Sequence, residues 1–271
     1  MSAAALQRVV VRLLHDPALV AALPHHPIPG AELTAQELAW LRAVDPRRWR
    51  VDPLRRYRSL QAALEECPAA GALAIRQRGV PGVDAFFSAP AFHTAIQTRQ
   101  ALAPSFGAWL ADAFGGAVAA MAHLELAIGR VRRSASGGST MPTDGRLALA
   151  PGWAPVAPPA GTLAAWQALI ARLDAHGGGR LAAVVDGAWR LPPVRLGPEP
   201  EGLLVEAGPA IGEAALPLVR FLEALADPRT PAQALALLAE LGAEGEEAAD
   251  LLAELQADGL VWGGQVGQRE G

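Results

Sequence analysis

The sequence predicts an α+β fold, in which an N-terminal irregular α-helical bundle is followed by a C-terminal winged helix made of a β-hairpin and three helices. Apolar residues recur at helical spacing through most of residues 1–133. Residues 134–161 are rich in Gly, Ser and Pro and interrupt that spacing, although the apolar Leu147, Leu149 and Trp153 could form a short strand. Residues 162–271 contain short apolar runs followed by three more helical patterns. We therefore expect a helical domain over 1–133, a linker over 134–161 and a winged-helix domain over 162–271.

In the N-terminal part, the helices are predicted from apolar spacing and from capping residues. Leu6, Val9 and Leu13 lie three or four positions apart and indicate a first helix. Thr34 followed by Glu37 is a capping box that opens another helix. Further helices are expected from Pro53, where proline suits a first turn, and at about 86–102, 106–114 and 118–131. The apolar stretch Val83–Phe92 is expected to lie in the core, or to lie in the core and also contact a partner.

In the C-terminal part, the apolar period changes from that of helices to that of strands. The Asp186-Gly187 pair between two apolar runs predicts a hairpin. We expect strands at Leu181–Val185, Trp189–Leu191 and Leu203–Val205. Three helices should follow at about 213–226, 231–241 and 244–257, with Thr230 capping the second of them. A last short strand is expected at Leu260–Trp262.

Composition excludes several classes of protein. About half of the residues are apolar (51%), which is enough for a sizeable core. The single cysteine, Cys67, excludes an internal disulfide framework, a CxxC redox pair and a Cys-rich zinc site. No run of eighteen apolar residues predicts a transmembrane helix, and the N-terminus lacks the apolar core of a secretory signal. We therefore expect a cytoplasmic protein that makes no membrane contact.

Charge is distributed unevenly along the chain. All 23 basic residues are Arg; residues 1–133 hold 15 of them against 10 acidic residues, whereas residues 134–271 hold 8 against 17. Residues 210–271 hold 11 acidic residues and 3 Arg, and the third predicted helix has no basic residue. A DNA-binding winged helix must neutralise phosphates with Arg or Lys, so we expect no DNA binding by this helix.

No sequence motif assigns a catalytic residue or a metal ligand. GxSxG, HExxH, Walker A and GxGxxG patterns are absent from the sequence. His123 and Glu125 would lie on different faces of a helix, which makes a poor chelate. His25-His26 lies in a Pro-rich turn that is either solvated or in contact with a neighbouring protein or metal. Cys67 precedes a proline at a helix end and fits packing better than nucleophilic chemistry.

An Arg-rich segment with interleaved aromatic residues is the most uneven feature of the N-terminal part. Arg and aromatic residues are enriched at protein interfaces. A solvated amphipathic helix and an RNA-binding surface remain alternatives. The candidate partner-interface residues are Trp40, Arg47, Arg48, Trp49, Arg55, Arg56 and Tyr57.

Two stretches resemble proteins that make ribosomal peptide natural products. The predicted hairpin with "FLEALADPRTPAQALALLAELG" and "EEAADLLAELQADGLV" resembles the PqqD-like peptide-recognition domains of these pathways. The upstream stretch "LTAQELAWLRAVDPRRWRVDPLRRYRSLQAALEECPAA" is similar to the helical region in partner subunits of multinuclear non-heme iron peptide oxidases. Such partners include those of the 3-thiaglutamate and methanobactin pathways.

The resemblance implies a non-catalytic partner subunit whose winged helix binds a precursor peptide and whose helical domain binds the iron oxidase. The chain would hold no cofactor of its own, because the iron would belong to the oxidase. In the resembled domains the peptide lies between the third strand and the third helix, as an added strand. This implies peptide-binding residues Leu203, Leu204, Val205 and Glu206 beside Asp250, Leu251 and Glu254.

Three other hypotheses remain open from the sequence. The residues assigned to peptide binding could instead seal the core or form a solvated acidic face. The chain could be a winged-helix transcription regulator with an N-terminal helical sensor. It could also be an enzyme whose catalytic residues come together only in the folded chain.

Overall fold

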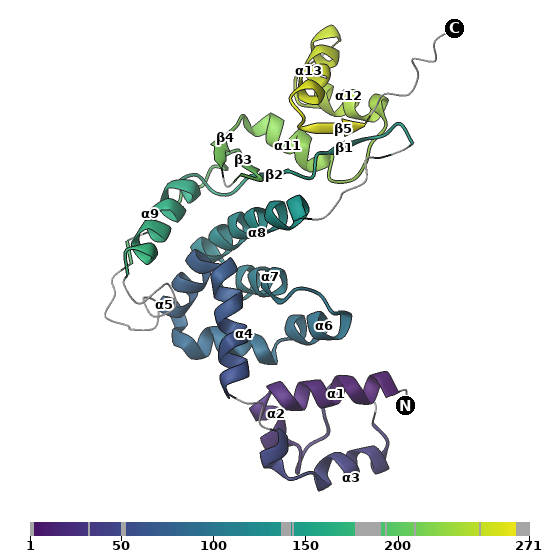
Figure 1. Ribbon diagram of the computed structural model, residues 1–271, viewed down its shortest axis with the longest axis vertical. Coiled ribbons are helices and arrows are strands. Elements are labelled where there is room, and N and C mark those ends of the chain that lie inside the picture. The colour runs from purple at the N-terminus through teal and green to yellow at the C-terminus, as the bar shows by residue number, and fades with distance from the viewer. Residues whose placement is uncertain are drawn as a thin grey trace. The chain divides into compact units, whose positions relative to one another are not determined.

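The structure is a computed structural model that describes residues 3–31, 33–49, 53–136, 142, 144–176, 191–192, 194–208, 210–243 and 245–263 (Figure 1). It combines α-helices with short antiparallel strands, which confirms the predicted α+β class. The chain forms two compact units. Unit 1 comprises Met1–Ala122 and Ala168–Pro192, and unit 2 comprises His123–Gln167 and Pro193–Gly271. These boundaries differ from the predicted ones, since residues 134–161 belong to unit 2.

The described regular elements of unit 1 are all helical. Helices lie close to the positions predicted from Pro53 and at 106–114 and 118–131, whereas the helix predicted at 86–102 is divided at Ala89 and ends at Thr98. Thr34 accepts a hydrogen bond from the Glu37 backbone N–H, and the Glu37 carboxylate accepts one from the Thr34 N–H, which confirms the capping box. The elements are α1 (Ala3–His15), α2 (Pro17–Ala22), α3 (Ala35–Ala43), η1 (Pro46–Trp49), α4 (Pro53–Glu66), α5 (Pro68–Asp84), η2 (Ala85–Ser88), α6 (Pro90–Thr98), α7 (Leu102–Phe114) and the start of α8 (Gly116–Ser136).

Helix α5 contains a sharp break before its last turn. Gly79 adopts φ +68° and ψ 178°, a conformation that side-chain-bearing residues rarely adopt, and Pro81 follows it without a backbone N–H to donate. The segment after the break carries Val80 and Asp84, both of which line the groove described below.

The core of unit 1 has an aliphatic part and an aromatic part. Val9, Leu13 and Trp49 belong to a buried cluster formed by α1–α3 and η1. Phe86, Phe87, Phe92 and Phe106 are buried, and the Phe86 ring centroid lies 5.1–5.9 Å from those of the other three. The expectation that the Phe-rich stretch lies in the core is confirmed.

Unit 2 contains two small antiparallel sheets. Strands β2 (Trp153–Val156), β3 (Leu203–Glu206) and β4 (Ile211–Glu213) form one sheet in the order β2-β3-β4. Strands β1 (Leu147–Leu149) and β5 (Val261–Gly263) form the other. The predicted linker therefore supplies one strand to each sheet. The predicted hairpin around Asp186-Gly187 lies outside the described residues apart from Leu191, and the hairpin that is observed joins β3 to β4.

The helices of unit 2 pack in two clusters on the two sides of β3. Leu203 and Val205 are buried with apolar residues of α8, whereas Leu204 packs against the cluster formed by the C-terminal helices. Thr230 and Gln233 form a second capping box, which confirms the prediction that Thr230 caps this helix. The helices are α9 (Thr162–Asp174), of which the residues up to Gln167 belong to this unit, and α11 (Leu216–Ala224), α12 (Pro231–Glu240) and α13 (Glu246–Ala257). In the part of the chain that the structure describes, no helix is both long and apolar enough to cross a bilayer.

Candidate functional site

Strand β3 has no open edge, so the predicted peptide-binding edge is wrong. β3 pairs with β2 through Ala154↔Val205 and with β4 through Leu204↔Gly212. The ladders continue past both ends of the strand, since the Ala207 N–H donates to the Gly152 carbonyl and the Ala214 N–H to the Gly202 carbonyl. The sequence does not indicate this pairing, because β2 lies in the Pro-rich segment that is predicted to be a linker.

The residues assigned to peptide binding divide between core and surface. Leu203 and Val205 are buried and seal the core, and Glu206 is exposed. Leu204 and Leu251 are partly buried against the same apolar cluster. The two acidic residues predicted beside them on α13, Asp250 and Glu254, point into solvent.

The open edge of the three-stranded sheet is β4. In the hairpin of β3 and β4, the Glu206 N–H donates to the Ala210 carbonyl and the Ala214 N–H donates to the Gly202 carbonyl. Glu206 with Ala210, and Gly202 with Ala214, are therefore hydrogen-bonded pairs. Because bonded and non-bonded pairs alternate, the N–H and C=O groups of Ile211 and Glu213 point away from β3. No other strand among the described residues pairs with that side of β4.

The opposite edge, formed by β2, is less suited to accept a further strand. Gly152 with Ala207, and Pro158 with Glu201, are hydrogen-bonded pairs just beyond the two ends of β2. Because bonded and non-bonded pairs alternate, Pro155 and Leu204 are a non-bonded pair, and the nitrogen of Pro155 points away from β3. Proline has no N–H, so this edge lacks a donor at its centre. β4, with its exposed Gly212 and Glu213, is the better candidate for strand addition.

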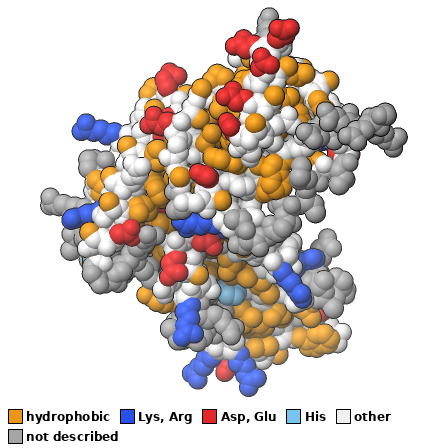
Figure 2. Space-filling model, turned by 45° about the horizontal axis from the view of Figure 1, so that its top comes forward, with side chains coloured by type: hydrophobic (Ala, Val, Ile, Leu, Met, Phe, Trp, Pro, Cys, Tyr) orange, Lys and Arg blue, Asp and Glu red, His pale blue; other side chains and the backbone are white. Residues whose placement is uncertain are grey.

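The C-terminal helix of unit 2 is strongly acidic. In the described helix α13, every ionisable side chain is a carboxylate, and Asp258 follows directly after it. Figure 2 shows many acidic side chains at the upper end of the face in view. The acidic side chains of α13 are Glu246, Glu247, Asp250 and Glu254, all of them exposed.

Unit 1 contains an apolar groove of about 880 Å³. Its walls come from α1, α2, η1, α4 and the segment of α5 after the Gly79 break. Three prolines, Pro17, Pro24 and Pro46, contribute to these walls. The larger apolar side chains lining the groove are Leu14, Val20, Trp49, Tyr57, Leu60 and Val80.

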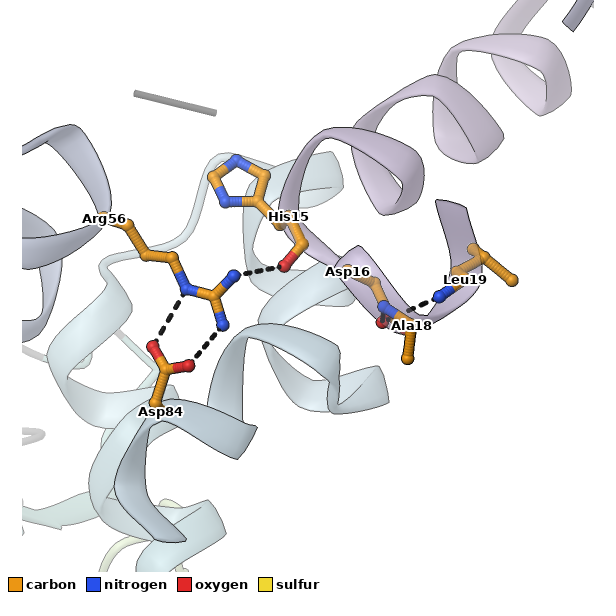
Figure 3. Close-up of polar contacts among 6 residues, drawn as sticks. All are labelled: His15, Asp16, Ala18, Leu19, Arg56 and Asp84. Carbon is orange, nitrogen blue, oxygen red and sulfur yellow. Dashed lines mark hydrogen bonds and ion pairs between the residues drawn. The ribbon is translucent and has the colours of Figure 1, made fainter. Parts of the chain in front are cut away.

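An ion pair between α4 and α5 forms the polar part of the groove (Figure 3). The Arg56 Nε donates to Asp84 Oδ1 at 2.9 Å, and Arg56 Nη2 donates to Asp84 Oδ2 at 2.5 Å. Arg56 Nη1 also donates to the His15 carbonyl at the end of α1 at 3.0 Å. The guanidinium carbon lies 4.9 Å from the ring centroid of Phe87. This bidentate contact joins three helices and fixes one wall of the groove.

The predicted interface residues differ in their exposure. Trp40 on α3 and Tyr57 on α4 expose 58% and 53% of their surfaces, and Arg47 and Arg48 on η1 are exposed. Trp49 exposes only 7%, because its ring belongs to the aliphatic core while part of it lines the groove.

Arg56 is held in the ion pair with Asp84 and is therefore partly structural. The side chain of Arg55 lies outside the described residues. The interface pattern in the sequence does not include Val80 and Asp84, which the break in α5 brings to the groove. The Gly-Val-Pro-Gly sequence at residues 79–82 is the signal that indicates this break.

His93 is the most unusual buried polar group of unit 1. It is 6% exposed, and neither ring nitrogen has a hydrogen-bond partner in the described structure. Burial, and to a smaller extent the positive charges of Arg12 and His15, lower the pKa of His93 to about 4, whereas Asp16 opposes them.

The described residues contain no group of three or more His, Cys, Asp or Glu side chains placed to hold a metal ion. Cys67 is buried. His123 is exposed while Glu125 is buried, so these two residues lie on different faces of α8.

No protein-family model matches the sequence, and no curated protein matches it.

Proposed function

We propose that this chain is a non-catalytic partner subunit that binds a precursor peptide on a winged helix within unit 2 and presents it to an iron-dependent peptide-modifying oxidase. The oxidase contacts unit 1 and holds the iron, and the complex works in the cytoplasm. The arrangement into two compact units supports this proposal, since one unit offers an open strand edge and the other offers exposed aromatic and Arg side chains.

The open edge of β4 is the observation that carries the proposal. The outward-facing N–H and C=O groups of Ile211 and Glu213, which pair with no other described strand, can bond an extended peptide as a fourth strand. Strand addition recognises backbone, so it suits a partner whose side chains are to be presented to another protein. The proposal places the peptide on β4, in place of the position on β3 that the resemblance implied.

The acidic surface of unit 2 favours a basic peptide. Residues 210–271 carry 11 acidic residues and 3 Arg, which attracts Lys and Arg side chains and repels phosphate backbones. The same charge argues against the regulator hypothesis, because a winged helix that binds DNA requires a positive surface.

Co-purification tests the proposal directly. The full chain is co-expressed with a multinuclear non-heme iron oxidase and with the short peptide encoded beside it. We expect a complex of the chain with both, and loss of peptide retention when the chain is omitted. Failure of the chain to retain either one would overturn the proposal.

Replacing one donor on the edge strand tests where the peptide binds. Glu213→Pro removes an outward-facing N–H without removing a bond to β3, so we expect peptide affinity to fall about tenfold while the circular dichroism spectrum is unchanged. The matched variant Glu213→Gln also loses the charge but keeps the N–H, and it should bind nearly as well as the parent. Equal weakening by both variants would mean that the carboxylate, and not the edge, contacts the peptide.

A further inference from the structure

We infer that the apolar groove of unit 1 is a docking site for an acidic amphipathic helix of a partner protein. Apolar side chains on one face of that helix enter the groove, and its acidic face meets Arg47 and Arg48. This inference deepens the proposed function, on which it rests for the existence of a protein partner, by specifying the chemistry of the surface that unit 1 recognises.

Exposed apolar surface concentrates at this groove. Among the described residues, the exposed large hydrophobic side chains are Trp40, Tyr57 and Val80, all of them in unit 1. Tyr57 and Val80 line the groove, and Trp40 lies on α3. Each exposed apolar Å² covered by a partner contributes about 25 cal/mol, so leaving these side chains in water is unfavourable. Tyr, Trp and Arg are also the residues that most often dominate binding energies at interfaces.

Several residues in the walls of the groove are held by packing and by an ion pair within unit 1. Pro17 lies at the start of α2, Pro46 at the start of η1, and Trp49 is fixed in the core. The ion pair of Arg56 with Asp84 holds α4 against the end of α5. A groove formed in advance spares a partner the entropic cost of ordering it. A helix that presents apolar side chains at positions i, i+3 or i+4, and i+7 is the peptide shape that such grooves accept.

The charge around the groove specifies an acidic partner. Arg47 and Arg48 lie between Pro46 and Trp49, which both line the groove, and both guanidinium groups are exposed. Within the described residues neither guanidinium forms an ion pair with an acidic side chain of this chain. The described carboxylates near them accept other hydrogen bonds: Asp84 pairs with Arg56, and Asp16 accepts the N–H groups of Ala18 and Leu19. Asp45, which is exposed, accepts the backbone N–H of Arg47.

Figure 2 shows basic and hydrophobic side chains side by side at the lower end of the face in view. Exposed Arg side chains beside an apolar groove are complementary to a helix with one apolar and one acidic face.

Peptide titrations on the full chain test the inference. Two synthetic helical peptides share the same Leu and Phe positions at helical spacing, and their remaining positions are Glu in one peptide and Lys in the other. Fluorescence anisotropy should show the Glu peptide binding at least about tenfold tighter than the Lys peptide at low salt, with the difference shrinking at high salt. Equal affinity for the two peptides, or no binding of the Glu peptide, would overturn the inference.

Surface variants locate the site. Val80→Asp places a charge in the apolar groove at an exposed position, and Arg47→Glu with Arg48→Glu reverses the charge beside it. Each variant should weaken the Glu peptide at least about tenfold. The control Arg195→Glu with Arg220→Glu makes the same change of charge at exposed positions of unit 2 and should leave binding unchanged. Equal effects of the control and the groove variants would overturn the assignment, as would displacement of the Glu peptide by an RNA oligonucleotide.

The same variants separate this inference from the proposed function. The titrations use no oxidase, so a chain that binds the Glu peptide in the groove but retains no oxidase would contradict the proposed function alone. A chain that retains the oxidase equally well with and without Val80→Asp would contradict the groove as the partner contact while leaving the proposed function intact.

Discussion

At the scale of single residues, His93 makes the stability of unit 1 depend on pH. The unfolded state binds a proton at a pKa near 6.5, whereas the folded state resists protonation of His93 down to about 4. The contribution of neutral His93 is complete above pH 6.5 and is lost as the pH falls toward 4. Arg12 and His15 on α1 add to this effect, and Asp16 counteracts it.

We predict that His93→Leu flattens the acid side of the stability profile. Chemical denaturation of the parent should show the free energy of unfolding decreasing by up to about 3 kcal/mol between pH 6.5 and pH 4, in addition to the general acid effect. The variant should lose most of that additional slope. His25→Leu, at an exposed histidine, is the control and should keep it. The idea fails if both variants titrate alike.

A second residue-scale prediction concerns a glycine at the start of β3. A Cβ at Gly202 would lie 2.3 Å from the Ala214 carbonyl oxygen, which is backbone that cannot move away without breaking the hairpin. Gly202→Ala should therefore lower the free energy of unfolding by at least about 2 kcal/mol. Gly212→Ala, in β4, is the matched control, because nothing lies within 4 Å of a Cβ there. A thermal melt of both variants compares them, and equal melting temperatures would refute the packing argument.

At the scale of elements, Glu201 secures the start of α9 from a distant part of the chain. Its carboxylate accepts the N–H of Gly161 at 2.8 Å and that of Leu163 at 2.9 Å, which are groups that a helix leaves without partners at its first turn. Negative charge at that end also interacts favourably with the helix dipole.

We expect Glu201→Ala to cost about 1–2 kcal/mol of stability, measured by urea denaturation. Glu201→Gln should recover part of the loss, since its amide oxygen can still accept one bond. Glu199→Ala, at an exposed position nearby, should have almost no effect. A loss from Glu199→Ala as large as that from Glu201→Ala would rule out a specific capping role.

Elements whose signals are local could be predicted from the sequence, and those that depend on distant partners could not. The capping residues Thr34 and Thr230 each find their partner three positions along the chain, so their helices were placed correctly. The status of β3 as a central strand depends on β2, which lies about fifty residues upstream in a Pro-rich segment. Leu147, Leu149 and Trp153 indicate that a short strand is possible there, but nothing local indicates that it pairs with β3.

The same distinction applies to the groove. The exposure of Trp40 and Tyr57 fits the aromatic and Arg pattern seen in the sequence, but the groove itself is formed by side chains from five separate elements. Asp84 reaches Arg56 across 28 residues, a pairing that charge spacing along a single helix does not indicate.

At the scale of the whole molecule, the acidic charge of the C-terminal half predicts that the chain does not bind DNA specifically. The acidic excess of residues 210–271 should prevent a specific complex with the DNA upstream of its own gene at about 150 mM NaCl. A mobility-shift assay over a range of salt concentrations measures this. A specific shift that weakens steeply with salt would instead favour the transcription-regulator hypothesis.

The pairing of β1 with β5 sets a limit on how the protein can be dissected. Leu147 lies opposite Gly263, so the first and last strands of unit 2 complete each other although more than a hundred positions separate them. A truncated protein that starts at residue 162 would lack β1 and β2, so each sheet would lose one strand. The unpaired backbone groups of β5 and β3 would then be free to pair with other molecules. Such a truncation should precipitate, whereas one that starts near residue 123 would retain both missing strands.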